Sequence, residues 1–258
     1  MKIVLGIEYN GSDFHGWQSQ DNVVTLQGTL EQALTKIANV PIKVFCAGRT
    51  DAGVHATGQV VHFETDVIRN PRAWTLGANM YLPSSMSVRW MQEVDEHFHA
   101  RFSATARRYR YVIYNHSLRP ALLSSRVTWH YYPLDDEAMR QAAAHLLGKH
   151  DFSSFRSSAC QSKTPIRTVT EISIKRVGDF IYIEIEANAF LHHMVRNIAG
   201  VLMQIGSGWQ QPDWALQVLH SKDRRAAAET ASPHGLYLIE VKYPESYPFP
   251  TQSALGLI

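Results

Sequence analysis

The stretch Gly48-Arg49-Thr50-Asp51-Ala52-Gly53-Val54-His55-Ala56 lies between two apolar segments, residues 42–47 and 59–63. Both segments have the composition of β-strands. Glycines within the stretch let the backbone turn where a Cβ would obstruct it. Loops that rigid strands hold in place often carry catalytic groups. We therefore predict that Asp51 stands on a tight loop between two strands, with the guanidinium group of Arg49 two residues earlier.

The pattern on either side of this loop mixes strands and helices in both halves of the chain. Apolar alternation predicts strands, and apolar residues three or four apart predict helices. The expected strands are residues 2–9, 42–47, 59–63, 86–94, 109–114, 169–175, 180–185 and 236–241. The expected helices run from Leu26 to a stop at Pro41, between Pro71 and Pro83, from Asp135-Asp136 to Gly148, and over residues 194–205. Without a strict βαβ alternation, this order indicates the α+β class.

Composition sets broad limits on what the chain is. Its 258 residues, 45% of them hydrophobic, suffice for two domains with their own cores. We place these domains at residues 1–105 and 106–258. The two cysteines, Cys46 and Cys160, are far apart and form no C-x-x-C, so a disulfide framework is not expected. We see no secretory signal and no membrane span, and we expect a soluble, cytoplasmic protein.

The charges are almost balanced in total but uneven along the chain. There are 25 Lys and Arg against 23 Asp and Glu. Residues 99–126 hold six arginines without any Asp, Glu or Lys, and three tyrosines are interleaved with them. Arginine forks match phosphate geometry, and tyrosine rings stack on unpaired bases. The region indicates a nucleic-acid surface, although an ordinary strand with solvated charges has the same pattern.

Three interpretations of Asp51 are open from the residues alone. Asp-Ala-Gly is similar to the catalytic loop of aspartic proteases, but that chemistry needs a second carboxylate, and no second loop of this type occurs. A metal site could draw on Asp51 with His55 and His62, and with His192 and His193, although none of these has the H-E-x-x-H spacing. The third interpretation is that Asp51 only caps a turn.

Longer motifs around the loop favour a different interpretation. With Gly58-Gln59-Val60 and His62-Phe63, the loop resembles the signature of the TruA family of tRNA pseudouridine synthases. The resemblance continues in order along nearly the whole chain, and only the tail after Tyr243 lacks it. Further matching motifs are Tyr9-x-Gly11, Phe14-x-Gly16-Trp17-Gln18-x-Gln20, Ala100-Arg101-Phe102-Ser103-Ala104, Arg108-Tyr109-x-Tyr111, Phe152 with Ser154-Phe155, Arg167, Asn188-x-Phe190-Leu191, His192-His193-Met194-Val195-Arg196-Asn197 and Gly235-Leu236-Tyr237-Leu238.

The resemblance implies a fold and a reaction. The implied fold has two RNA-recognition-like α+β halves, joined into a mixed, mainly antiparallel sheet with helices packed on one side and an active cleft between the halves. The implied reaction is isomerisation of uridine to pseudouridine at positions 38, 39 and 40 of the tRNA anticodon stem-loop, with the base flipped out of its stack. The implied partners are the anticodon arm of tRNA and a second copy of the chain in a homodimer.

The resemblance also assigns roles to individual residues. Asp51 is the implied nucleophile, with Arg49 and Arg196 favouring its ionised form. Tyr109 is implied to stack on the base and to help remove the C5 proton. The implied substrate-binding residues are Tyr109, Leu236, Arg107, Arg108, Arg110 and His55.

No metal, organic cofactor or membrane is implied, because the isomerisation adds no group and changes no oxidation state. Two rivals remain. A catalytically silent RNA-binding protein would keep the basic tyrosine region without needing Asp51. A nucleoside hydrolase would need a water-activating base that the loop does not clearly provide.

Overall fold

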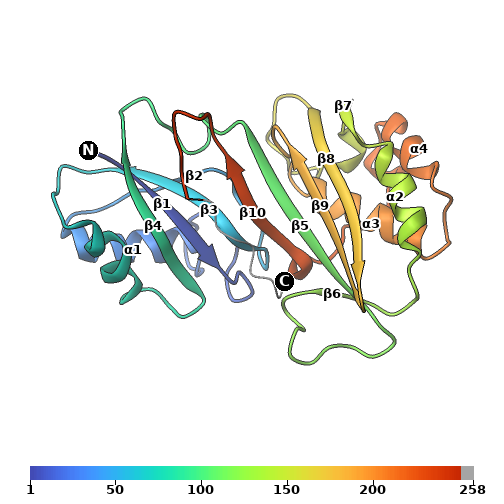
Figure 1. The fold of residues 1–258 in the computed structure, drawn as a ribbon, viewed down its shortest axis with the longest axis horizontal. Helices are drawn as coiled ribbons and strands as arrows, with labels where there is room; N and C mark the ends of the chain where they lie inside the picture. The colour runs from blue at the N-terminus through green and yellow to red at the C-terminus, as the bar shows by residue number, and fades with distance from the viewer. Residues whose placement is uncertain (251–258) are drawn as a thin grey trace. The chain divides into compact units, whose positions relative to one another are not determined.

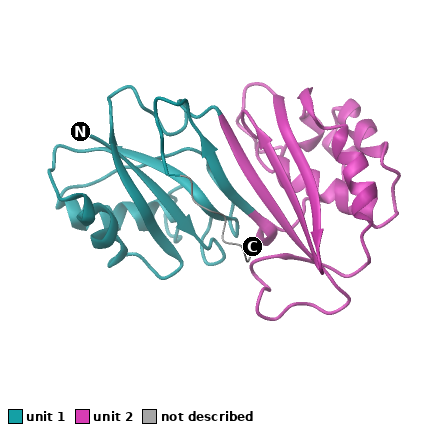
Figure 2. Ribbon diagram, in the orientation of Figure 1, with its two compact units in different colours: residues 1–105, 237–258 teal, residues 106–236 magenta. Residues whose placement is uncertain are grey.

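A computed structural model describes residues 1–250 of the chain. It confirms the α+β class: the described residues form two compact units, each with a mixed, mainly antiparallel sheet (Figures 1 and 2). Unit 1 consists of residues 1–105 and the chain from Tyr237 onward, and unit 2 consists of residues 106–236. No helix in the described residues is long and apolar enough to cross a bilayer.

The sheet of unit 1 is built around β1 and β3, whose residues are nearly all buried. Strand β1 pairs antiparallel with both β3 and β4, β2 pairs antiparallel with β3, and β10 pairs parallel with β3. The order in this unit is therefore β4-β1-β3-β10. The strands are β1 (Lys2–Tyr9), β2 (Phe45–Cys46), β3 (His55–Glu64), β4 (Met86–Val94) and β10 (Leu236–Lys242).

One face of this sheet is covered by helix α1 (Leu26–Ala38), which begins at its predicted cap (Figure 1). The Thr25 side chain accepts a hydrogen bond from the Gly28 N–H, at 3.3 Å, which satisfies one of the open backbone donors of the first turn. The helix ends before Pro41 because Asn39 adopts a left-handed conformation, with φ of 60°. A π-helical turn, Ala73–Gly77, follows where the second helix was predicted.

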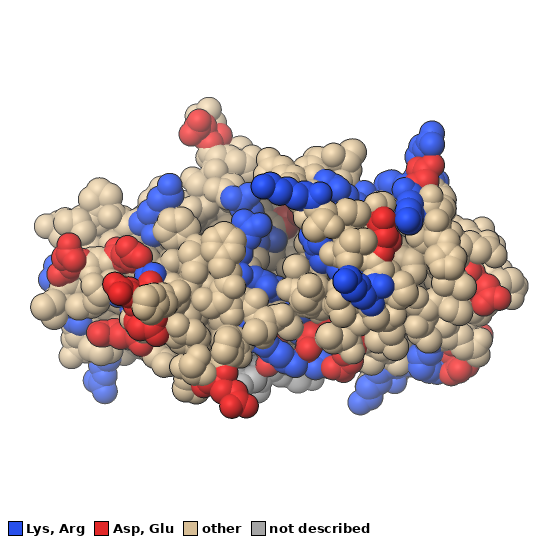
Figure 3. Space-filling view, turned by 90° about the horizontal axis from the view of Figure 1, so that it is seen from above, with Lys and Arg blue, Asp and Glu red and all other residues tan. Residues whose placement is uncertain are grey.

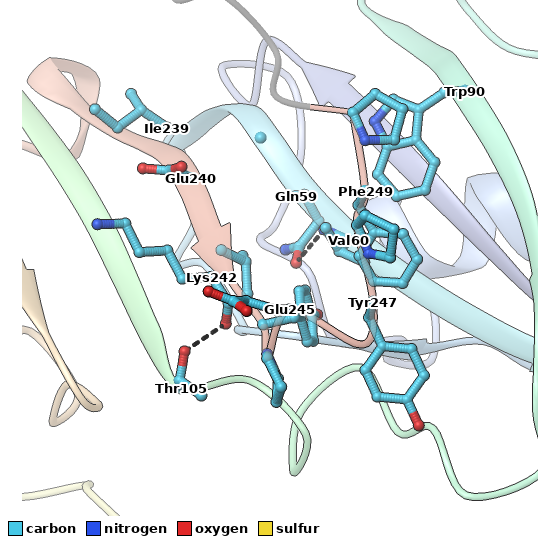
Figure 4. Close-up of a pocket in the computed structure, with 16 residues that line it drawn as sticks. Gln59, Val60, Trp90, Thr105, Ile239, Glu240, Lys242, Glu245, Tyr247 and Phe249 are labelled. Atoms are coloured by element: carbon cyan, nitrogen blue, oxygen red, sulfur yellow. Dashed lines mark hydrogen bonds between the residues drawn. The ribbon is translucent and has the colours of Figure 1, made fainter.

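The other face of the sheet is covered by the last described segment of the chain. Phe98 is fully buried there, with ring centroids 4.9 Å from Tyr247 and 5.3 Å from Phe249. Phe249 also stacks on Trp90 at 5.2 Å (Figure 4). Between this segment and strands β3 and β10 lies a cavity of about 560 Å³, with Glu240 among its lining residues. The segment thus supplies apolar cover that the family motifs did not predict.

The sheet of unit 2 has the order β5-β9-β8-β7, with all three pairings antiparallel, and β6 pairs parallel with β5. The predicted hairpin is confirmed, and its strands are longer than expected. Helix α3 packs against β5 and helix α2 against β8. The elements are β5 (Ala106–Asn115), β6 (Thr128–His130), β7 (Gly148–Asp151), β8 (Ile166–Val177), β9 (Phe180–Ala187), α2 (Asp136–Ala144), α3 (Met194–Gly206) and α4 (Trp214–Ser221).

The domain bounds expected from the sequence, 1–105 and 106–258, stay a prediction. The structure groups residues 1–105 with the chain from residue 237 onward. The physical reason is strand pairing, because Tyr237 and Leu238 bridge to His55 and Ala56 on β3. A local pattern identifies a strand but not the sheet that the strand joins.

Candidate functional site

The loop that carries Asp51 is anchored to the neighbouring strand and to the opening motif. The Tyr9 hydroxyl on β1 lies 2.8 Å from the Thr50 hydroxyl, and this hydrogen bond is buried. The Trp17 N–H donates to the Thr50 carbonyl at 2.9 Å. Asp51 therefore follows a residue fixed through both its side chain and its backbone. Asp51 itself is half-buried and Arg49 is exposed.

Two glycines allow this loop to fold tightly. Gly53 has φ of +79°, a conformation that side chains with a Cβ rarely adopt. Gly16 has φ of +86°, and a Cβ there would come within 3.2 Å of the Thr50 carbonyl oxygen, the Ala52 nitrogen and the Asp51 carbonyl carbon. The opening motif and the loop of Asp51 pack backbone against backbone, which explains why the two motifs occur together.

A buried glutamine closes the base of the loop. The Gln59 amide nitrogen donates to the Gly48 carbonyl at 2.7 Å and lies 3.4 Å from the Tyr9 hydroxyl. Hydrogen bonds therefore hold the loop at its first residue, Gly48, and at Thr50, the residue before Asp51. A carboxylate held by such a frame meets the positional requirement of a nucleophile or general base.

His55, a predicted substrate-binding residue, is buried at the start of β3. Its Nδ1 accepts a hydrogen bond from the Gly11 N–H at 3.1 Å, and its ring stacks on Tyr237 at 4.6 Å. These contacts join the loop to the opening motif and to β10. His62 lies further along the same strand, roughly 20 Å away at the rise of a β-strand. The two histidines are therefore too far apart to share a metal ion.

Tyr109 lies on β5 of unit 2, opposite Ile185 on β9. Its residue surface is 8% exposed, and its ring meets Phe190 edge to face at 4.9 Å. Because side chains alternate along a strand, Tyr109 and Tyr111 share one face of the sheet, and Arg108 and Arg110 share the other. The basic tyrosine motif thus divides into an aromatic face and an arginine face.

Arg196 lies in the first turn of α3, where a cation opposes the helix dipole. Its Nε donates to the Ala231 carbonyl at 2.8 Å. The preceding cap residue, His193, has φ of 65°, a strained conformation for a residue other than glycine. A cation placed against the dipole beside a strained cap is typical of a functional position rather than of helix stabilisation.

Tyr111 was quoted in the sequence motif without a role, and the structure shows that it holds the segment before Leu236. Its hydroxyl donates to the Ser232 carbonyl at 2.8 Å and lies 2.6 Å from the Thr128 hydroxyl. Burial raises the pKa of Tyr111, so the hydroxyl stays protonated and remains a donor. Leu236, 6% exposed, follows this anchored segment.

The three arginines predicted to bind substrate are all engaged within unit 2. Arg107 is buried and donates to the Asn188 carbonyl at 3.2 Å. Arg108 bonds Glu171 at 2.7 Å and Glu184 at 2.9 Å, and Arg110 bonds Glu184 at 2.6 Å. Figure 3 shows that acidic and basic residues both occur on the face of the molecule drawn there. Arg108 and Arg110 are thus matched by carboxylates on the neighbouring strands.

Sequence reasoning missed the residues that support the loop. Gln59 and Tyr9 were quoted within motifs, but their hydrogen bonds to the loop depend on the β1–β3 register, which one sequence does not contain. The positive φ of His193 is also invisible in a sequence. Spacing offered one usable signal: Gln59 directly follows a glycine inside a strand, a position that often marks a close approach of two backbones.

Comparison with known proteins identifies relatives of both units. A family model described as tRNA pseudouridine synthase matches residues 7–103 and 142–244. The protein called tRNA pseudouridine synthase A of Photorhabdus laumondii is 60% identical over 250 residues, covering 97% of this chain and 95% of that protein. The protein of the same name from Pseudoalteromonas atlantica is similar to the same extent. One from a Shewanella species is 59% identical over 256 residues, covering 99% and 98%.

Proposed function

Because the chain belongs to the tRNA pseudouridine synthase family of isomerases, we propose that it converts uridine to pseudouridine at positions 38, 39 and 40 of the tRNA anticodon stem-loop. In this reaction the N1–C1′ bond breaks, the base turns, and C5 bonds to C1′. The C5 proton leaves to solvent and N1 gains a proton, so atoms and charge balance without a cofactor. The observation that carries the proposal is the doubly anchored loop around Asp51.

Asp51 is proposed as the nucleophile. Only the carboxylate form attacks carbon, so the group must be ionised at neutral pH. Arg49, two residues away on the same loop, is proposed to act beside it. The anchors at Thr50 and Gly48 fix the position of the carboxylate, and a fixed position lowers the entropic part of the barrier. Two routes are open to such a carboxylate. It attacks the sugar directly, or it abstracts a sugar proton to give a glycal.

Residues of unit 2 are proposed to act on the same uridine. Tyr109 stacks on the flipped base and assists removal of the C5 proton, and Leu236 forms an apolar wall beside it. Arg196 balances the charge of Asp51. The remaining proposed substrate contacts are His55, Arg107, Arg108 and Arg110. In support, the Tyr109 ring packs on Phe190, Arg196 donates to the Ala231 carbonyl, and Leu236 is buried.

Base flipping sets the energetic requirement of this site. Extruding a stacked uridine costs a few kcal/mol, and stacking on an aromatic ring returns about 1–3 kcal/mol. Phosphate contacts supply the remainder, and they make binding weaken as salt rises. We further infer that the enzyme acts as a homodimer, as the resemblance implies. We also infer that it acts in the cytoplasm. Sedimentation of the purified protein with and without tRNA tests the dimer.

The decisive experiment measures tritium release from tRNA labelled at uridine C5. Asp51→Asn should lower turnover by at least roughly 10³-fold, because the amide has no nucleophilic charge. The affinity for tRNA should stay within threefold of wild type. Asp66→Asn, which removes an exposed carboxylate elsewhere on unit 1, is the matched control and should release tritium normally. Equal release from Asp51→Asn and wild type would refute the nucleophile, and no release from wild type would favour a silent RNA-binding protein.

A further inference from the structure

Unit 1 carries a second surface of chemical interest, at the opposite end of β3 from the Asp51 loop. Phe45 on β2 is paired with His62 on β3, and their rings stack at 5.2 Å. The His99 ring lies 5.7 Å from Phe45 and 4.3 Å from Phe102. We call this group the aromatic–basic surface, and its members are Lys43, Phe45, His62, His99, Arg101 and Phe102.

Two rings of this surface are unusually open to solvent. Phe45 is 45% exposed and Phe102 is 75% exposed. Full burial of such a side chain stabilises a protein by about 1.5–3 kcal/mol. Phe45 and Phe102 contribute much less than this to stability, because their rings are exposed. Single exposed apolar residues are ordinary, but His99 joins these two into one continuous group. Open, contiguous ring faces of this kind are what unpaired bases stack on.

The histidines of the surface present hydrogen-bond donors. The Ala100 N–H donates to Nδ1 of His62 at 3.1 Å, and the Arg101 N–H donates to Nδ1 of His99 at 3.1 Å. A neutral imidazole that accepts at Nδ1 carries its proton on Nε2. Burial lowers the pKa of His62 to about 4, so the ring is neutral at physiological pH. The partly exposed ring of His99 therefore offers an N–H suited to phosphate or base oxygens, whereas His62, 2% exposed, supports the surface from beneath.

Both histidines line a hollow of about 410 Å³, together with Phe45, Lys2 and Lys43. The Lys2 ammonium already has partners within the unit. It lies 3.2 Å from the Glu64 carboxylate and donates a hydrogen bond to the Phe98 carbonyl. Glu64 also lines the hollow. Lys43 is exposed and has no carboxylate partner among residues 1–250. Beside the hollow, the Arg101 guanidinium lies 5.5 Å from the centre of the Phe102 ring. The net charge available to a ligand is positive.

This surface is linked to the loop of Asp51 through β2 within the same unit. Arg49 and Arg101 both lie close enough to Cys46 to lower the pKa of its thiol, although burial outweighs them and raises it to about 12. Cys46 is the neighbour of Phe45 on β2. Cationic side chains thus extend from the catalytic loop to the aromatic rings. The two ends are separated by most of β3, roughly 20 Å, which is the span of several nucleotides.

From this arrangement we propose that the aromatic–basic surface binds a second segment of the tRNA substrate, several nucleotides away from the target uridine. An unpaired base stacks on Phe102 and Phe45, and its phosphates contact Lys43 and Arg101. The inference rests on the proposed function in one respect only, namely that tRNA is the substrate. It adds a contact that positions the RNA through unpaired bases and backbone rather than through the reacting uridine.

The test compares tRNA binding by surface variants in the turnover-free Asp51→Asn background. Phe45→Ala/Phe102→Ala should raise the Kd for full-length tRNA about 10–100-fold, because stacking on a ring is worth about 1–3 kcal/mol. The same variant should bind an RNA duplex of equal length as the parent does, since a duplex offers no unpaired base. Tyr81→Ala, which removes a 51% exposed ring elsewhere on unit 1, is the matched control and should change neither Kd.

Salt dependence separates the two kinds of contact. Lys43→Ala should reduce the slope of log K against log salt by about 0.7, the value for one phosphate contact on a single strand. The double phenylalanine variant should keep the wild-type slope. An unchanged Kd for tRNA, or an equal loss with the duplex, would overturn the proposal. Because binding is measured, the result stands even if the wild-type protein releases no tritium from tRNA, which would refute only the proposed reaction.

Discussion

Arginine has two different roles in the two units of this protein. On unit 1, Arg49 is exposed on the loop of Asp51 and has no carboxylate partner among the described residues. On unit 2, Arg108 and Arg110 are bonded to Glu184, and Arg108 also to Glu171. Two arginines of the arginine-dense stretch are therefore charge-balanced, whereas the isolated Arg49 is not, within residues 1–250.

The difference follows from strand register. Arg110 lies directly opposite Glu184, and Arg108 directly opposite Glu186, across the β5–β9 pair. Opposite charges at such positions attract one another, and each pair contributes roughly 0.2–1 kcal/mol to the sheet. A run of one charge along a strand thus says little about the surface, because the neighbouring strand supplies the other sign. Two predictions test this contrast, and a third concerns a buried histidine of unit 1.

The largest effect is expected at Arg49. Arg49→Ala should lower the rate of tritium release about 100-fold, as loss of a preorganised charge beside the reacting group does. The free energy of unfolding in urea should change by less than about 0.5 kcal/mol, because the side chain is exposed. A loss of turnover no greater than that of Arg108→Ala would remove the contrast between the units.

A smaller effect, and a different one, is expected at Arg108. Arg108→Ala leaves Glu171 and Glu184 without their shared partner, so the free energy of unfolding should fall by about 1–2 kcal/mol. Urea denaturation monitored by circular dichroism measures this. Arg119→Ala, an arginine of the same run without an ion pair among residues 1–250, is the control. If Arg108→Ala instead unfolds normally and reduces the salt slope of tRNA binding, the guanidinium is a phosphate ligand, as the sequence alone suggested.

The smallest effect is expected at His62 and concerns pH. Burial, followed by the charges of His99 and Lys2, lowers the pKa of His62 from 6.5 to about 4. The unfolded chain therefore takes up a proton at higher pH than the folded protein does. The stability contributed by neutral His62 is complete above pH 6.5 and is lost as the pH falls toward 4.

His62→Gln should accordingly lose less stability between pH 6.5 and 4 than wild type does. His99 and His130 also have lowered pKa values and remain in both proteins, so the measured quantity is the difference between the two unfolding curves. Parallel curves over this range would show that His62 titrates normally and that its buried, neutral state has been misassigned.

The fold was largely predictable from the sequence, because local pattern determines most of its elements. The strand Lys2–Tyr9 and the helix capped by Thr25 were found at their observed starts. Tertiary pairing decided the rest. The strand expected at residues 42–47 pairs only at Phe45–Cys46, and the one expected at 59–63 extends back to His55. No pattern in β10 indicates that it returns to the first sheet.

The residues proposed for the candidate site come from the sequence, whereas the contacts that support the loop were not predictable from it. Motif resemblance selected Asp51, Arg49 and Tyr109, since these residue types suit the implied chemistry. The hydrogen bond of Tyr9 to Thr50 and the pairing of Arg110 with Glu184 arise from register between strands far apart in sequence. Register depends on the whole sheet, so one chain read alone does not reveal it.

The return of β10 to β3 has a consequence for biosynthesis. Unit 2 is one uninterrupted segment, whereas the sheet of unit 1 contains residues from both ends of the chain. While the nascent polypeptide leaves the ribosome, the segment that emerges first must wait for its last strand, and the segment in the middle is free to fold ahead of it. Asp51 is thus made early and gains the β10 side of its sheet only after unit 2 has been synthesised.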